Sequence, residues 1–305
     1  MGEIDVSKFK IIDKRDDFIE ENLSRPNMNY WKEVFRKIIN NKAAMAAILI
    51  LLIMCIMSII GPSLTSYKYD IENKALANKF PSALHIFGTD IKGRDIFVRV
   101  WKSMRTSFAI GFIVAFINIS IGVVFGAICV YYGGLVDDIT MRIIEILTSI
   151  PSLLLMIELL MIFRIGVVSM IIAMGLVGWC SVARLMRGQL LQIKQQEYVL
   201  AAQALGANPS RVITKHLITN VLNIAIVSLA LEIPNAILNE IILSFIGFGV
   251  PEPLISFGNL FRDSYENIRF YSYQMFIPGI IISLTLISLN ILGDALAEAL
   301  DYRLN

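Results

Sequence analysis

Residues 197–220 read EYVLAAQALGANPSRVITKHLITN, a compact polar stretch set between two long apolar runs. It opens with strong helix formers, and Gly206 can adopt the left-handed conformation that ends a helix. Asn208 and Pro209 suit the N-cap and the first position of a second helix. The stretch therefore predicts a rigid helical hairpin over 197–215, and we expect a soluble partner to dock on it. An amphipathic hairpin that rests on the bilayer surface is the alternative.

The composition of the chain is that of a membrane protein. Of its 305 residues, 56% are hydrophobic and only 17% are charged, and the mean hydropathy is +0.67. Soluble domains carry about a quarter charged residues. A helix needs roughly 20 mainly apolar residues to cross a hydrocarbon core of about 30 Å. Six runs approach or exceed that length and predict an all-α polytopic membrane protein with six transmembrane helices, at 43–62, 108–132, 141–163, 165–183, 218–246 and 270–293.

The distribution of basic residues predicts how these helices are oriented. Lys and Arg are frequent in 25–42 and in 184–215, and such residues favour the cytoplasmic side of a membrane. We therefore expect both termini and the hairpin to be cytoplasmic. The expected segments are a cytoplasmic part with an interfacial helix (1–42), a first transmembrane helix (43–62), an extracellular segment (63–105), a transmembrane domain (106–297) and a cytoplasmic tail (298–305). The net charge of +2 gives no indication of a nucleic-acid partner.

Polar and small residues occur at helical spacing inside the predicted spans. Small or slim residues recur along 108–132 and predict close helix packing: they are Gly111, Ala115, Asn118, Gly122 and Gly126. Two polar stripes are expected to line a substrate pathway. The first stripe consists of Glu145, Thr148, Ser149 and Ser152, on a helix that Pro151 should bend. The second stripe consists of Glu232, Asn235, Asn239 and the adjacent Glu240. A carboxylate inside a span is costly unless it faces protein or water. Hydrogen bonds between helices are the alternative explanation for both stripes.

Residues for catalysis or metal binding do not form a convincing pattern. No G-x-x-x-x-G-K-[ST] phosphate loop is present, so the chain does not bind ATP by that motif. The two histidines, His85 and His216, lie on opposite predicted sides of the membrane. We therefore expect a non-catalytic subunit with no metal site and no cofactor of its own.

The hairpin resembles the EAA loop of importer-type ABC transporter permeases. Its acidic residue, paired alanines and glycine stand as Glu197, Ala201, Ala202 and Gly206. Four further stretches resemble the oligopeptide, dipeptide and nickel permease family, specifically its C-subunit type: 85–95, 131–151, 240–247 and 290–301. The similarity covers roughly residues 30–305. The chain departs from the family pattern at Thr219 and Tyr302, where proline is usual, and at Ala297, where a basic residue is usual.

The resemblance implies a type I importer permease fold in the plasma or inner membrane, with membrane lipid around it. It also implies a homologous B-type permease, two ABC ATPases that bind ATP and Mg²⁺, and an extracellular peptide-binding protein. The residues expected to couple the chain to an ATPase are Glu197, Ala201, Ala202, Gly206, Ala207 and Arg211. Transport of oligopeptides or dipeptides would proceed by alternating access between the two permeases.

Other functions remain open from the sequence. Nickel import by the same family is one alternative. A proton-coupled secondary transporter, with Glu145, Glu232 and Glu240 as proton relays, is another. An intramembrane protease with a pair of aspartates is disfavoured because no Asp lies within a predicted span. The segment 63–105 is long for a connection between helices, so we expect it to contact the binding protein or guide peptide inward. A loosely ordered lid over the outer mouth is the alternative.

Overall fold

The computed structural model describes residues 30–300, and within that range the chain is nearly all helical and has no β-strand. Its longer helices are α2 (Tyr30–Asn40), α3 (Lys42–Ile60), α4 (Ile96–Tyr132), α5 (Gly134–Ser149), α6 (Ser152–Phe163), α7 (Val167–Lys194), α8 (Glu197–Ala204), α10 (Thr219–Ile246), α11 (Phe257–Tyr265) and α12 (Tyr273–Leu300). Shorter elements are η2 (Gly61–Ser63), η3 (Lys74–Leu76), α9 (Pro209–Arg211) and the π-helix η4 (Val212–Ile218). The expectations for 1–29 and 301–305, including Tyr302, lie outside the described residues.

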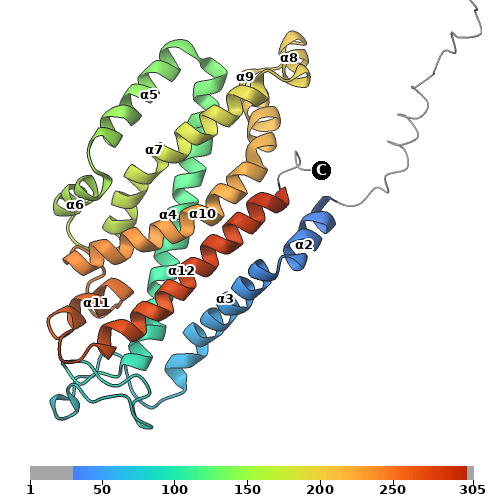
Figure 1. The fold of residues 1–305 in the computed structure, drawn as a ribbon. Coiled ribbons are helices and arrows are strands. Elements are labelled where there is room, and N and C mark those ends of the chain that lie inside the picture. The colour runs from blue at the N-terminus through green and yellow to red at the C-terminus, as the bar shows by residue number, and fades with distance from the viewer. Residues whose placement is uncertain (1–29, 301–305) are drawn as a thin grey trace, which may run out of the picture.

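Five helical stretches are long and apolar enough to cross a membrane. They are Lys42–Ser63, Ile96–Tyr132, Val167–Lys194, Pro209–Ile246 and Tyr273–Leu300. Helices α5 and α6 together form a sixth candidate span that is bent by 91°. The expected membrane protein with up to six spans is confirmed, and Figure 1 shows the helices side by side as one bundle.

The bend that Pro151 predicted within 141–163 is confirmed, but the segment consists of two helices rather than one continuous helix. The first helix ends at Ser149, and Ile150 is extended, with φ −90° and ψ 135°. Pro151 causes this break because its ring disfavours a helical conformation in the preceding residue. Ser152 starts the differently directed α6, so it does not share a helix face with Glu145 and Ser149.

Two other boundaries differ from the predicted ones. The fifth span begins at Pro209, because α9, η4 and α10 run on as one stretch of 38 residues. The second arm of the hairpin is therefore the first part of a long candidate span rather than a separate short helix. At the opposite end of the bundle, which we call its outer end after the expected extracellular segment, α4 begins at Ile96, where Asp95 as the N-cap accepts a hydrogen bond from the Val98 amide. The outer segment thus ends about ten residues earlier than expected.

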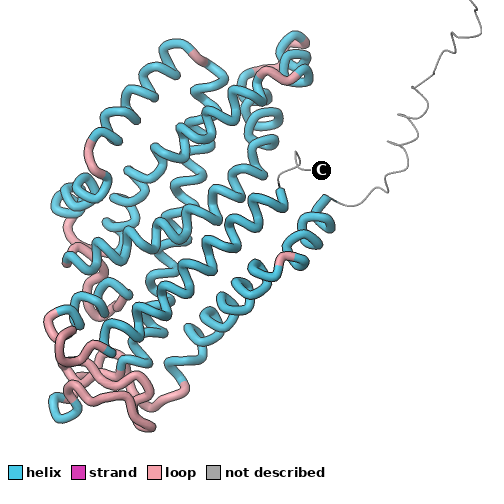
Figure 2. Tube along the Cα trace, viewed as in Figure 1, coloured by secondary structure: helices cyan, strands magenta, loops and turns pink. Residues whose placement is uncertain are grey.

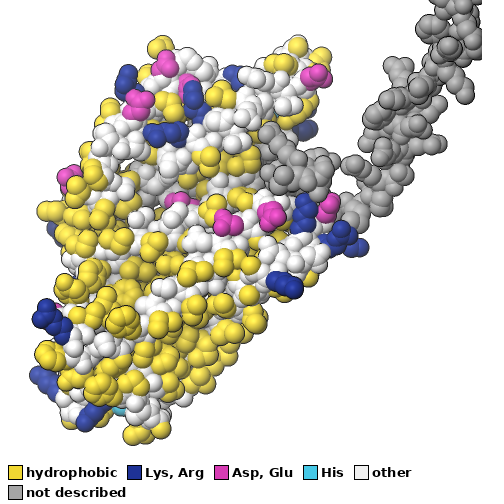
Figure 3. All heavy atoms as spheres, in the orientation of Figure 1, with side chains coloured by type: hydrophobic (Ala, Val, Ile, Leu, Met, Phe, Trp, Pro, Cys, Tyr) yellow, Lys and Arg dark blue, Asp and Glu magenta, His cyan; other side chains and the backbone are white. Residues whose placement is uncertain are grey.

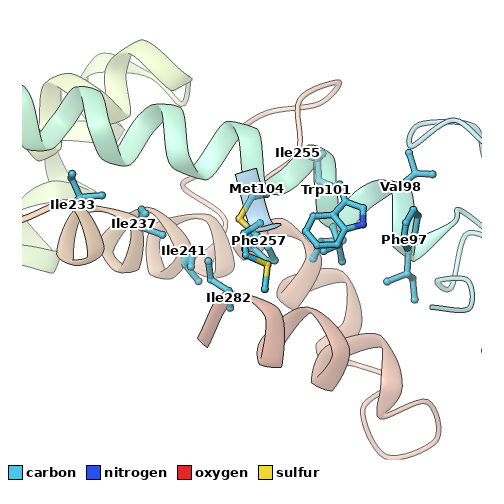
Figure 4. Packing of buried hydrophobic residues seen from close by; sticks show 14 of the residues in the cluster. Phe97, Val98, Trp101, Met104, Ile233, Ile237, Ile241, Ile255, Phe257 and Ile282 are labelled. Atoms are coloured by element: carbon cyan, nitrogen blue, oxygen red, sulfur yellow. The ribbon is translucent and has the colours of Figure 1, made fainter. Parts of the chain in front are cut away.

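The core is built around α4, which packs most extensively against α7 and α10. In its outer half, large apolar side chains from α4, α10, α11 and α12 form one cluster (Figure 4), among them Trp101, Met104, Ile237, Phe257 and Ile282. In its inner half, the expected row of small residues lets α7 approach closely. A Cβ atom on Gly122 would lie 2.5 Å from Val182 Cγ1.

Helices α2 and α3 lie at the edge of the bundle. Val34 and Ile38 of α2 pack against the end of α12. Arg105 of α4 donates hydrogen bonds to the carbonyls of Ser58 and Ile59, which are among the last of α3. One side of α3 packs against α12, and most of its remaining surface is exposed within the described chain. Figure 3 shows hydrophobic side chains over much of the visible face. Such a surface suits contact with lipid or with another membrane subunit.

We predict that Gly122→Ala destabilises the bundle. The added methyl group would overlap Val182 and the backbone of Ala183, and overpacking of this kind costs about 1–3 kcal/mol. Thermal unfolding of the protein in detergent should show a lower midpoint. Gly188→Ala in α7 is the matched control, because its Cβ would meet nothing within 4 Å. An equal loss in both variants would contradict the close packing of α4 on α7.

Candidate functional site

The turn of the hairpin has the geometry that the sequence predicted. Gly206 has a φ of +79°, in the left-handed region that favours glycine. Asn208 Oδ1 accepts a hydrogen bond of 2.8 Å from the Arg211 amide, and Pro209 occupies the first turn of the next helix. Gly206 has open space around it, so its backbone conformation, and not crowding, requires glycine.

The base of the hairpin is fastened to the bundle by buried apolar side chains. Val199 on α8 and Val212 and Leu217 on η4 are fully buried against α4 and α7. Lys194, at the end of α7, donates from Nζ to the carbonyl oxygens of Val130 (2.6 Å) and Tyr131 (3.2 Å) near the end of α4. The base of the hairpin is therefore packed against α4, α7 and α10.

The tip of the hairpin is open to solvent and carries large apolar side chains. Leu205 is 88% exposed, and Leu200 and Tyr198 are about half exposed. Of the predicted coupling residues, Glu197, Ala201, Gly206 and Arg211 are exposed, whereas Ala202 and Ala207 are half-buried. Sequence reasoning missed Leu205, although a large apolar residue directly before a helix-ending glycine was a visible signal. Figure 1 places α8 at the end of the bundle opposite the outer loops, which Figure 2 shows in pink.

The π-helix η4 lies where the chain departs from the family pattern. Thr219 Oγ1 donates a hydrogen bond of 3.0 Å to the Thr214 carbonyl, and Asn220 Nδ2 donates to the His216 carbonyl at 2.5 Å. These side chains give carbonyls of the wider π-helical turn additional partners. Thr219 therefore has a local structural role that proline could not reproduce, because proline has no hydroxyl group.

The second polar stripe divides into buried and accessible parts. Glu240 is fully buried and accepts hydrogen bonds of 2.7 Å from Ser107 of α4 and from Ser244. Glu232 is half-buried and accepts a 2.9 Å bond from Asn118 Nδ2. Asn235 is exposed and Asn239 is half-buried. The position of Glu240 favours a bond between helices over contact with a pathway, whereas the other three side chains remain accessible.

The first polar stripe lies on the exposed side of α5. Glu145 is exposed and pairs with Arg142 at 3.1 Å, and these two residues line a shallow pocket together with Asp138. Ser149 is exposed farther along α5, and Ser152 is exposed on α6. Among the described residues, α5 is attached to α7 mainly through the buried Ile144 and an ion pair between Asp137 and Arg187.

The outer segment is ordered by a network of hydrogen bonds and ion pairs. Asp95 Oδ2 lies 2.8 Å from His85 Nδ1. Asp90 accepts from Arg94 Nε at 2.7 Å, and Asp263 of α11 accepts from Arg94 (2.7 Å) and from Arg99 (2.8 Å). These contacts give the residues around 85–95 a structural role. They hold the segment against α4 and α11.

Two further contacts complete this outer region. Tyr273 at the start of α12 donates its hydroxyl to the carbonyl of Lys79 at 2.8 Å. Glu72 accepts a hydrogen bond from the Lys92 ammonium at 2.9 Å, and this bond lowers the pKa of the Glu72 carboxyl group. The outer segment is therefore tied to the first residues of α12 as well.

Comparison with known proteins identifies two matching family models. Residues 118–305 match the binding-protein-dependent transport system inner membrane component, and residues 29–81 match the N-terminal TM domain of oligopeptide transport permease C. The chain is 41% identical over 284 residues to an oligopeptide transport system permease protein OppC of Bacillus subtilis, covering 93% of each chain. It is 40% identical over 285 residues to a dipeptide transport system permease protein DppC of the same organism, covering 93% of this chain and 89% of the relative. An OppC protein of Escherichia coli is 34% identical over 283 residues, covering 92% and 94%.

Proposed function

The chain belongs to the family of binding-protein-dependent transport system inner membrane components, and we propose that it is the permease subunit of an ATP-driven importer of oligopeptides or dipeptides. The similarity to named oligopeptide and dipeptide permeases over nearly the whole chain carries this proposal. Those names favour peptide over nickel as the substrate. The rigid hairpin with an exposed apolar tip supports a role in contacting a soluble motor subunit.

The chain itself would be non-catalytic in this machine. Two ABC ATPase subunits would bind ATP and Mg²⁺, and one of them would contact Leu205 and the exposed residues of α8. Closure of the ATPases would displace the hairpin, and its buried base would pass that displacement to α4, α7 and α10. A homologous B-type permease would supply the other half of the pathway.

The accessible polar side chains are the candidates for the wall of this pathway. They are Glu145, Ser149, Ser152, Glu232, Asn235 and Asn239. Polar groups at membrane depth are stable only where they face protein or water. A cavity between two permeases would provide water for them. Glu240 is left out of this set because its carboxylate is enclosed within the chain.

The outer segment is proposed to receive an extracellular peptide-binding protein. Its ordered contacts with α4, α11 and α12 support this role, because a docking surface must hold its shape when the partner arrives. If the outer segment is extracellular, both termini lie in the cytoplasm, and we include this orientation in the proposal. The hairpin and the outer segment lie at opposite ends of the bundle, as this topology requires (Figure 1).

We predict opposite accessibility for two single cysteines in a background without Cys55, Cys129 and Cys180. Lys74→Cys on the outer segment should react with an impermeant thiol reagent in intact cells. Ser210→Cys in the hairpin should react only after the membrane is permeabilised. Both positions are exposed, so burial within the chain does not account for a difference. Labelling of Ser210→Cys in intact cells would reverse the proposed orientation.

Transport by the complete assembly tests the function directly. Proteoliposomes that contain all subunits should accumulate a labelled tripeptide only when ATP and the binding protein are both present. A protonophore should leave uptake unchanged, and labelled nickel should not accumulate. Peptide uptake driven by a proton gradient without ATP would instead support a secondary transporter.

We predict that Gly206→Val uncouples the hairpin from transport. A β-branched residue is strained at a φ of +79°, at a cost of roughly 1–2 kcal/mol, which corresponds to a shift of about five- to thirtyfold in population. Peptide uptake should fall by a factor in that range, and binding protein should no longer stimulate ATP hydrolysis. Gly206→Asn is the control, because asparagine tolerates this conformation and should retain most activity. Normal uptake by a normally expressed Gly206→Val protein would remove the turn from the mechanism.

A further inference from the structure

A cavity of about 300 Å³ opens at the outer end of the bundle, between the residues around Tyr69 and the connection from α10 to α11. We call it the outer cavity. Arg94, Arg99 and Asp263 form its inner part, and the two arginines are only 5% and 3% exposed. Asp70, Glu72, Glu252 and Arg262 are also part of its lining, and all four are exposed. The outer cavity therefore has buried guanidinium groups inside and, at its mouth, three carboxylates and the one guanidinium group of Arg262.

The buried arginines have more hydrogen-bond donors than the described residues supply acceptors. Arg94 donates from Nε to Asp90 and from Nη2 to Asp263. Its Nη1 donates to no described residue, and the oxygen of Glu252, at 3.8 Å, is too distant for a hydrogen bond. Arg99 Nε forms an ion pair with Asp90 Oδ2 at 3.6 Å but has no hydrogen-bond partner within the described chain, and Arg99 Nη1 reaches only the Tyr69 carbonyl at 3.5 Å. A carboxylate has the paired oxygens that such planar groups bind best.

The mouth of the outer cavity has carboxylates without a close cationic partner. Glu252 is 78% exposed, and its nearest cations are Lys92 at 3.9 Å and Arg94 at 3.8 Å. Lys92 lies closer to Glu72, at 2.9 Å, so it is already engaged. No described residue forms an ion pair with Asp70 within 4.0 Å. Carboxylates at this position are suited to bind an ammonium group.

We propose that the outer cavity binds a small zwitterion of dipeptide size. Its carboxylate would accept hydrogen bonds from Arg94 and Arg99, and its ammonium group would lie near Glu252 and Asp70. The volume is at the lower end of the range for ligand pockets, about 300–1,000 Å³, which agrees with a ligand of that size. This inference rests on the proposed function, because it gives an imported peptide a binding site on the permease itself.

A measurement of dipeptide binding tests the inference. It uses the assembled transporter in lipid nanodiscs, without ATP and without binding protein. Equilibrium dialysis would compare dialanine with N-acetyl-dialanine, which lacks the ammonium group, and with dialaninamide, which lacks the carboxylate. We expect saturable binding of dialanine and at least about tenfold weaker binding of each blocked form, because a site built for a charged group rejects an analogue without it.

A pair of matched variants assigns the binding to this cavity. Glu252→Gln should weaken dialanine binding by about tenfold and leave N-acetyl-dialanine unchanged, because only the ammonium contact is lost. Glu266→Gln makes the same change of charge at an exposed position that does not line the outer cavity, and it should have no effect. Both changes are nearly isosteric and lie at the surface, so neither should disturb folding.

Several results would overturn the inference. Equal binding of dialanine and its blocked forms would do so, as would equal losses in the Glu252 and Glu266 variants. Absence of saturable binding at the highest soluble concentration would show a cavity filled by water only. Binding of acetate as tight as that of dialanine would show a simple anion site. Because the assay needs neither ATP nor binding protein, its failure would leave the uptake experiment, and with it the proposed function, unaffected.

Discussion

Inside the hydrocarbon region a polar side chain has no water to bond, so its partners must come from the protein. Glu240 meets this constraint with hydrogen bonds from Ser107 on α4 and Ser244 on its own helix. The Phe257 amide also reaches Ser107 Oγ, at 3.4 Å. This one enclosed carboxylate therefore joins α4, α10 and the start of α11. The apolar cluster of the outer half, drawn in Figure 4, is assembled around the same three elements.

Helix α4 connects the two ends of the molecule. With 37 residues at 1.5 Å each it is about 55 Å long, well beyond a hydrocarbon core of about 30 Å. Its outer end carries Arg99 of the ionic network, and its inner end receives Lys194 and lies beside the buried residues of the hairpin. A partner that contacts either end of α4 therefore contacts a helix that packs against its neighbours along most of its length.

Local features of the fold were predictable, and contacts between distant segments were not. The apolar runs predicted the spans, and Gly206 and Asn208 predicted the hairpin turn, because each depends on only a few neighbouring residues. Pro151 indicated a bend, but its angle depends on how α5 and α6 pack. The different positions of Glu232 and Glu240 depend on which residues of α4 face them, Asn118 for one and Ser107 for the other. The pairing of Arg94 with Asp263 joins residues 169 positions apart, so no local pattern could predict it.

The surface of α5 indicates that the described part of this chain is not complete by itself. One side of its exposed surface carries Arg142 and Glu145, and the adjoining side carries Ile139 and Ile143. Lipid would suit the apolar side but would leave the charged side without hydration. Water alone would suit the charged side but would expose the two isoleucines. Both sides are satisfied when α5 stands between lipid and a hydrated space closed off by a second membrane subunit. The amphipathic character of this one weakly attached helix thus supports the proposal of a pathway between this chain and a second membrane subunit.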